Sequence, residues 1–279
     1  MLIFLPMRGF LLLVLMIFGA LPAFACDLRT EGRPSAIAAY VEAARACLAA
    51  PPEGYAFDAD LEAGFLALVN DERRAAGLPP VALRTDLRAA ARFHSLDMAA
   101  NGFFGHHGPD GRSADDRIAA LDRTALADFS AENVATVSKS SGRMNPDFAL
   151  KRLHENLMNS PGHRENILHL KATHVAFGVV RTRSGVWVTQ VFLRLSGTLP
   201  EPAPLRMSET SRLRAPRGLD GWTFVRFDLI NQDGLEIPAV NLPALKGDAR
   251  LAAYATQPGE DALSFYWIRF LGPAVTVTP

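Results

Sequence analysis

The sequence predicts an α+β fold in which helices cover an antiparallel sheet. Apolar residues recur at helical spacing through the first half of the chain. From residue 174 the period changes to two, and the turn Thr182–Gly185 separates two alternating runs. Helices followed by a hairpin indicate a layered domain, helix on sheet.

The composition is that of an ordinary folded protein. Of the 279 residues, 49% are hydrophobic, which argues against disorder. Lys and Arg number 29, as do Asp and Glu. No net field therefore exists to attract nucleic acid, and we expect no nucleic-acid partner.

Residues 1–25 are typical of a signal peptide. Arg8 is the only charge before the apolar run Gly9–Gly19, and small residues at Ala23 and Ala25 suit cleavage before Cys26. The run is short for an uncleaved anchor, the other interpretation. We expect export to the periplasm or the exterior, with no transmembrane segment after signal removal.

The two cysteines leave three alternatives open. In an oxidising compartment Cys26 and Cys47 could form a disulfide that ties the new N-terminus to the following helix. Alternatively Cys26 carries a lipid anchor, although Pro22 and Ala23 are unusual in a lipoprotein signal. Two free thiols are the third possibility.

Helical spacing and capping residues divide the next part of the chain. Residues 26–54 are an N-terminal helical segment, with a helix over 34–50 and a linker at 51–54. The later helices are expected to begin at Asp58 or Asp60, at Thr85 or Asp86, at Ser113 with Asp116, at Asn145-Pro146 and at Ser160-Pro161. They end at Gly77, Gly102, Leu121 and Asn159.

A second linker, Pro200–Pro204, precedes a region with alternating patterns only. The strands expected there are 223–230, 250–256, 264–270 and 275–277. Residues 206–279 therefore form a small all-β domain of unknown role, in which no catalytic constellation is found.

Candidate chemistry lies between the two linkers. His106 and His107 occupy a Gly/Pro-rich loop, Glu132 heads an apolar run, and His163 lies in the first turn of a helix. Two histidines and a carboxylate can hold zinc or another divalent cation, or supply acid/base chemistry. The HExxH motif of metalloproteases is absent because His154-Glu155 is followed at the required spacing by Met158 and not by His, and no GxSxG motif exists.

Five motifs in this region resemble the bacterial CAP family (cysteine-rich secretory protein, antigen 5, pathogenesis-related-1; also called SCP-like). They are Leu68–Leu78, His94–Ala99, Phe103–His106, Glu132–Ala135 and Ser160–Leu168. The hairpin with Val175–Val179 and Trp187–Phe192 completes the pattern. The resemblance implies a CAP domain over residues 58–198 with a three-layer α-β-α sandwich.

The resemblance also implies a cleft with two His and two Glu, which binds a divalent cation, often zinc, in some family members. His106, Glu132 and His163 match three of these positions. Ser160 stands where the second Glu is expected, and Glu155 and Glu165 are its nearby substitutes. Three ligands would bind a cation more weakly than four.

Structural alternatives accompany these residues. His94 lies on the buried face of its helix and is expected to be a core histidine, and His107 a solvated neighbour of His106. His174 faces either solvent or the cleft. Glu132 could instead be a structural acceptor of backbone N–H bonds from a neighbouring loop.

Three functions remain open. The first is an exported binding module whose cleft takes a divalent cation or a small, lipid-like or envelope ligand. The second is a metal-assisted hydrolase of peptide or envelope polymer, with His106 and His163 as ligands and Glu132 as general base. The third is a structural envelope role without a ligand. The missing carboxylate favours binding.

Overall fold

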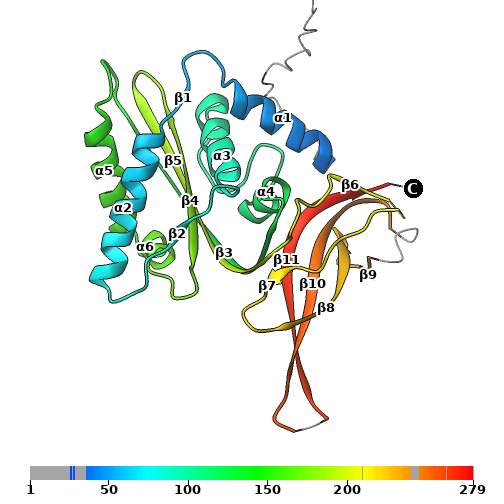
Figure 1. Ribbon diagram of the computed structural model, residues 1–279. Helices are drawn as coiled ribbons and strands as arrows, with labels where there is room; N and C mark the ends of the chain where they lie inside the picture. The colour runs from blue at the N-terminus through cyan, green and yellow to red at the C-terminus, as the bar shows by residue number, and fades with distance from the viewer. Residues whose placement is uncertain are drawn as a thin grey trace, which may run out of the picture.

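The computed structural model describes residue 26, residue 28 and residues 36–208, 210–239, 245–261 and 263–278. The predicted signal peptide lies outside these residues. Helices cover both faces of one mixed sheet in the N-terminal two thirds of the chain, as Figure 1 shows. The predicted three-layer α-β-α sandwich is therefore confirmed, with additional strands at the C-terminal end.

Three long strands form the centre of the sandwich. The predicted hairpin is β4 (His174–Arg181) paired antiparallel with β5 (Gly185–Thr198). On its other side β5 pairs with β3 (Ala125–Ser138), a strand of 14 residues. The sequence did not predict β3, in which only some of the residues follow an alternating pattern. The short strands β1 (Ala56–Phe57) and β2 (Ala82–Leu83) both pair with β4.

One helical layer consists of α2 (Ala59–Ala75), α5 (Pro146–Met158) and α6 (Pro161–Ile167). Of the two caps expected for α2, Asp58 is the one observed, because its side chain accepts a hydrogen bond from the backbone N–H of Leu61. These helices and the sheet bury a common core that includes Phe65, Leu153, Ile167, Phe177 and Phe192.

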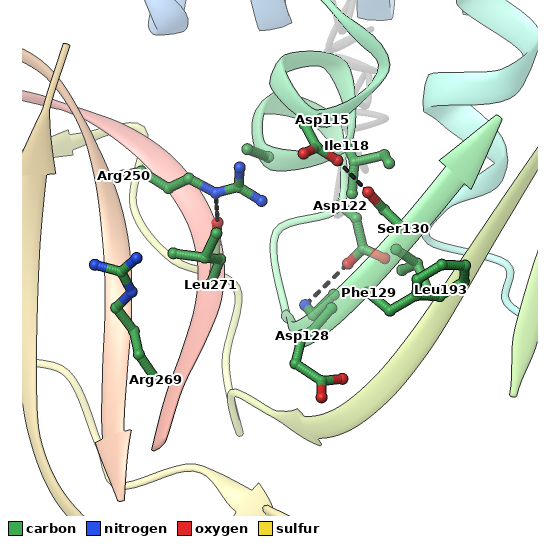
Figure 2. Close-up of a pocket in the computed structure, with 14 residues that line it drawn as sticks. Asp115, Ile118, Asp122, Asp128, Phe129, Ser130, Leu193, Arg250, Arg269 and Leu271 are labelled. Carbon is green, nitrogen blue, oxygen red and sulfur yellow. Dashed lines mark hydrogen bonds between the residues drawn. The ribbon is translucent and has the colours of Figure 1, made fainter. Parts of the chain in front are cut away.

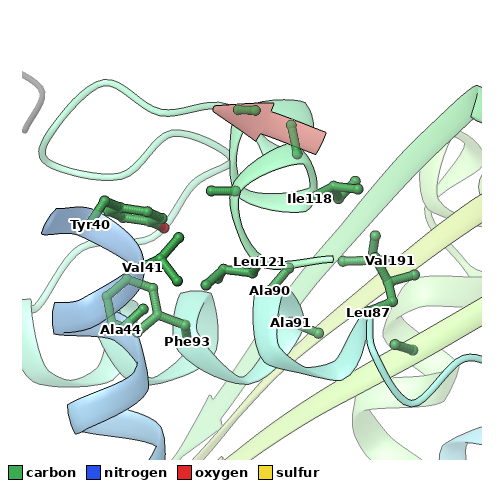
Figure 3. Packing of buried hydrophobic residues seen from close by; sticks show 14 of the residues in the cluster. Tyr40, Val41, Ala44, Leu87, Ala90, Ala91, Phe93, Ile118, Leu121 and Val191 are labelled. Carbon is green, nitrogen blue, oxygen red and sulfur yellow. The ribbon is translucent and has the colours of Figure 1, made fainter. Parts of the chain in front are cut away.

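The opposite layer consists of α1 (Ile37–Ala49), α3 (Arg88–Asn101) and α4 (Ala114–Leu121). Figure 3 shows how residues of these helices meet Val191 of the sheet. The capping box predicted at Ser113 and Asp116 is present at the start of α4.

The predicted start of α3 is wrong. Residues 85–87 form a turn, and the helix begins at Arg88 without a side-chain cap. The Asp86 carboxylate instead accepts a hydrogen bond from Thr124 Oγ1 and lies 3.9 Å from the guanidinium of Arg84. The local spacing predicted that Asp86 caps the helix, but its side chain contacts Thr124 and Arg84 instead.

The N-terminal segment is attached to the domain at two points. Cys26 and Cys47 form a disulfide with an S–S distance of 2.07 Å, so the predicted disulfide is confirmed. Asp248, far along the chain, accepts hydrogen bonds from the backbone N–H of Ile37 and so caps α1. The sulfur of a disulfide-bonded Cys26 is not available for a lipid anchor.

The C-terminal strands continue the same sheet. β11 (Phe265–Val277) pairs with β10 (Gly247–Pro258) and meets β3 where Leu271 faces Ala127. β8 (Thr223–Asn231) and β9 (Glu236–Pro238) follow β10, while β6 (Arg206–Met207) and β7 (Arg217–Gly218) pair with β11 and β5. A third core fills one face of these strands, with Leu229, Leu251, Phe270 and Val275.

The two strands expected at 264–270 and 275–277 are one strand. The register between β10 and β11 shifts next to Leu251, so that Gly272 and Pro273 together oppose one residue. Such a bulge accommodates a proline, which cannot donate to the ladder. In the part of the chain that the structure describes, no helix is long and apolar enough to cross a membrane.

Candidate functional site

Glu132 lies in the middle of β3, with its side chain only 3% exposed. Its backbone pairs with Val191 of β5, and this register fixes the position of Glu132 along the sheet. A carboxylate buried in this way needs compensating partners. Two side chains from separate segments of the chain are within hydrogen-bond distance of it, and His94 Nε2 lies 3.8 Å from Oε1.

The first partner is His106, on the Gly/Pro-rich loop that follows α3. Its Nδ1 lies 3.0 Å from Glu132 Oε1, so the structure brings together two of the three predicted site residues. The His106 side chain is 50% exposed, and with Nδ1 engaged its Nε2 is the nitrogen left for another group.

The second partner is Arg117, which sequence reasoning missed. Its Nη2 donates to Glu132 Oε2 at 2.7 Å, and both side chains are 3% exposed. Arg117 also donates to the backbone carbonyls of His106 and Arg112. It therefore binds the carboxylate and fixes the loop that carries His106.

His163, in the first turn of α6, is held next to this group through its backbone. Asn133 Nδ2 donates to the His163 carbonyl at 3.0 Å, and Asn166 Nδ2 donates to the carbonyl of Glu132 at 3.2 Å. These amides join α6 to β3. The His163 ring makes no hydrogen bond with any described residue. We call His106, Arg117, Glu132 and His163 the Glu132 site.

The charges of the Glu132 site shift its pKa values. Burial raises the pKa of Glu132, but the hydrogen bond from His106 and the charge of Arg117 outweigh it, so this pKa lies below its usual range. The same hydrogen bond raises the pKa of His106. Burial and then the charge of His106 lower the pKa of His163.

His94 is the core histidine that the helical spacing predicts. It is fully buried on α3, and its Nε2 lies 2.8 Å from the carbonyl of Gly105. Nε2 must therefore carry the proton, which leaves Nδ1 without a partner among the described residues. Burial lowers its pKa to about 4, and the charge of Arg117 adds to this effect. A neutral His94 supports the loop that carries His106.

The other candidates lie outside the Glu132 site. His107 is exposed beside His106, as predicted, and His174 is half-buried at the start of β4, where its Nδ1 contacts Thr173 Oγ1. Glu155 and Glu165 are exposed on α5 and α6. Neither contributes to the group around Glu132.

The structural role expected for Glu132 is corrected in one respect. Its carboxylate accepts hydrogen bonds from the side chains of Arg117 and His106, whereas backbone N–H groups of a nearby loop were expected. Short-range sequence signals could not identify Arg117, because its carboxylate partner lies 15 residues later, on a strand that the sequence did not predict.

The described residues contain no group of three or more His, Cys, Asp or Glu side chains arranged to hold a metal ion. The reason lies in the orientation of Glu132, since Arg117 holds one oxygen and His106 Nδ1 the other. A cation that took Glu132 as a ligand would compete with Arg117 or His106 for the same oxygen. In this arrangement Glu132 does not fit the role of third ligand in the predicted zinc site.

Comparison with known proteins identifies the domain that carries these residues. Residues 66–192 match the profile of the cysteine-rich secretory protein family, CAP. The chain contains a CAP domain of the bacterial type. The CAP domain is also 32% identical over 123 residues to the uncharacterized protein YkwD of Bacillus subtilis (strain 168), covering 44% of this chain and 43% of YkwD.

Two solved structures are similar to the CAP domain. One is an extracellular protein containing an SCP domain from Bacillus anthracis str. Ames, with 27% identity and a TM-score of 0.40, covering 48% of this chain and 40% of that one. The other is an outer surface protein from Borrelia burgdorferi, with 15% identity and a TM-score of 0.41, covering 49% of this chain and 94% of that one. This chain spans less than half the length of YkwD and of the Bacillus anthracis protein.

Proposed function

We propose that the protein is an exported binding module whose Glu132 site takes up an amphipathic ligand of the cell envelope. The observation that carries this proposal is the engagement of both Glu132 oxygens by Arg117 and His106. A carboxylate held in this way orients its neighbours. The disulfide between Cys26 and Cys47 supports the export component, because such bonds persist in oxidising compartments.

The groups open to a ligand are two imidazoles and an apolar side chain. His106 presents Nε2, and the neighbouring His163 ring has no hydrogen bond to a described residue. Phe104, two residues before His106, is 57% exposed. The imidazoles suit an oxygen-bearing head group and Phe104 an apolar tail, which together describe an amphipathic molecule.

A metal-assisted hydrolase has less support. A general base needs a free lone pair within reach of the water that it activates. Arg117 also lowers the basicity of Glu132, which acts against that mechanism.

The test uses palmitate and zinc as probes, titrated separately into the full chain by calorimetry. We expect palmitate to bind at one site, with affinity reduced about tenfold in His106→Ala and in Phe104→Ala, equivalent to about 1.4 kcal/mol each. His107→Ala is the matched control, because His107 is an exposed neighbour. Tight stoichiometric zinc binding with casein hydrolysis that is lost in Glu132→Gln would replace the binding module by the hydrolase.

A further inference from the structure

A cavity of about 800 Å³ lies on the seam between α4 and the C-terminal strands. Asp116 and Ala119 of α4 form one side, and Ile230, Arg250 and Arg269 form the other. A second cavity of about 280 Å³ shares both arginines, and Figure 2 shows them opposite α4 and β3. Cavities of this size at the junction of two structural units are typical ligand sites.

Arg250 is the group in this cavity that needs a partner. Its Nε donates to the carbonyl of Gly272 at 3.2 Å. Its two terminal amino groups have no hydrogen-bond partner within the described ranges. Burial lowers the pKa of Arg250, and the carboxylates of Asp115 and Asp116 offset this only in part. A half-buried cation with free donors favours an anionic ligand.

The carboxylates that line the same cavity are already engaged. Asp110 is bonded to Arg112, and Asp116 belongs to the capping box with Ser113. Asp248 caps α1 and accepts a hydrogen bond from Thr276. Each of these carboxylates therefore has a hydrogen-bond donor of its own, while the terminal amino groups of Arg250 bond to no described residue.

Three aromatic residues follow the cavity along the same face of the sheet. We call Tyr254, Trp267 and Phe265 the aromatic track. Alternate residues of a strand share a face, so Arg250 and Tyr254 of β10 lie on one side, as do Arg269, Trp267 and Phe265 of β11. The register pairs Tyr254 with Arg269 and so joins the two rows. Trp267 is 56% and Phe265 59% exposed, on the hairpin that extends from the body in Figure 1.

We propose that this face binds a polysaccharide that carries carboxylate groups. Sugar rings present C–H groups to which the negative faces of Trp267 and Phe265 are complementary, whereas the guanidinium of Arg226 already lies over the Tyr254 ring. Carboxylates on the same polymer match the free donors of Arg250. Arg269, which also pairs with Glu236 at 3.6 Å, adds a second positive charge beside it. No residue of the Glu132 site takes part, so this inference does not depend on the proposed function.

The hairpin turn favours this ligand over an anionic lipid surface. Leu263 at the tip is 93% exposed, but Glu260 and Asp261 are beside it, and anionic head groups would repel both. Glu260 accepts a hydrogen bond from Tyr266, which places it on the face opposite Trp267. The Glu260 carboxylate therefore lies off the aromatic track.

The test is affinity electrophoresis of the full chain in gels that contain polygalacturonate or dextran. We expect polygalacturonate to retard the protein, with the dissociation constant raised about tenfold in Arg250→Gln and in Trp267→Ala, and retardation to decrease with added salt. The controls are Arg152→Gln and Phe148→Ala on α5, which replace residues about as exposed as Arg269 and Trp267 elsewhere on the surface. Arg269→Gln, at a more exposed position, takes the place of Arg250→Gln if the latter unfolds.

Three results would overturn the inference. Polygalacturonate that does not retard the wild type excludes the ligand class. Equal retardation by dextran shows that the carboxylates are not recognised. Sedimentation with phosphatidylcholine vesicles, lost in Trp267→Ala and without binding to either polymer, assigns the aromatic track to a lipid surface.

Discussion

Arg117 Nη2 lies 2.7 Å from Glu132 Oε2, and both charged side chains are 3% exposed. An ion pair in this environment is sensitive to the loss of one partner, because the remaining charge stays buried without compensation. The pair joins α4 to β3 and holds the loop with His106. It is therefore a structural element of the site that no local sequence pattern reveals.

Arg117→Met is expected to destabilise the protein by about 3–5 kcal/mol, because it leaves the Glu132 carboxylate buried without its guanidinium. Urea unfolding followed by circular dichroism measures this. The double variant Arg117→Met/Glu132→Leu should recover part of the loss, since it removes both charges. A cost below about 1 kcal/mol for Arg117→Met would show that water replaces the guanidinium.

The two site histidines should titrate in a fixed order. His163 has a lowered pKa and His106 a raised one, so His163 loses its proton at the lower pH as the solution is made basic. Imidazole chemical shifts in an NMR titration measure both. Glu132→Gln should lower the pKa of His106, because the bond to the carboxylate is its largest cause. Identical titration of His106 in that variant would contradict the bond.

The bond between His106 and Glu132 also predicts a window of stability. The pKa of His106 is raised in the folded state, so its contribution to stability is complete below pH 6.5, the ordinary pKa of histidine. This contribution is lost as the pH rises through the pKa of His106 in the folded protein. The pKa of Glu132 is lowered in the folded state, so its contribution to stability is complete above pH 4.5, the ordinary pKa of glutamate. This contribution is lost as the pH falls through the pKa of Glu132 in the folded protein. The pair therefore stabilises the protein most between pH 4.5 and 6.5, which stability curves of wild type and His106→Ala would reveal as a difference.

The buried His94 lowers the stability of the protein at acid pH, whereas the pair of His106 and Glu132 raises it. Its pKa of about 4 in the folded state lies below the ordinary 6.5, so the unfolded chain takes up the proton first as pH falls. His94 should therefore cost about 3 kcal/mol of stability between pH 6.5 and 4. His94→Gln keeps a donor for the carbonyl of Gly105 and should flatten that part of the curve. An unchanged acid slope would show that His94 is protonated in the folded protein.

Gly178 marks the closest approach of α3 to the sheet. A Cβ at this position of β4 would lie 2.1 Å from the backbone carbon of Ala91 and 2.2 Å from the amide nitrogen of Arg92. Gly178→Ala is therefore expected to cost about 3 kcal/mol, because backbone cannot rotate away as a side chain can. Gly162→Ala is the control, since nothing lies within 4 Å of its Cβ position. Equal thermal stability of the two variants would contradict the packing.

Sequence reasoning succeeded where local chemistry decides the structure. The caps at Asp58, Ser113 and Asn145 each depend on a hydrogen bond within three residues, and all three are present. The hairpin of β4 and β5 follows from its alternation and turn. Of the three residues that the resemblance assigns to one cleft, the structure brings His106 and Glu132 into contact.

Prediction from the sequence failed where the structure depends on contacts between distant segments of the chain. Asp86 was expected to cap α3, but Thr124 and Arg84 take its carboxylate. The sequence predicted separate strands at 264–270 and 275–277, whereas the pairing of β10 with β11 shows a bulge in one continuous strand. These outcomes depend on partners many residues away, as does Arg117, and the spacing of nearby residues does not contain them.

The most direct test of the account is elemental analysis of the full chain purified from zinc-replete medium, wild type beside His106→Ala. Because Arg117 and His106 hold both oxygens of Glu132, the account predicts much less than one zinc per chain, with no difference between the two proteins. One zinc per wild-type chain that is lost in His106→Ala would contradict it.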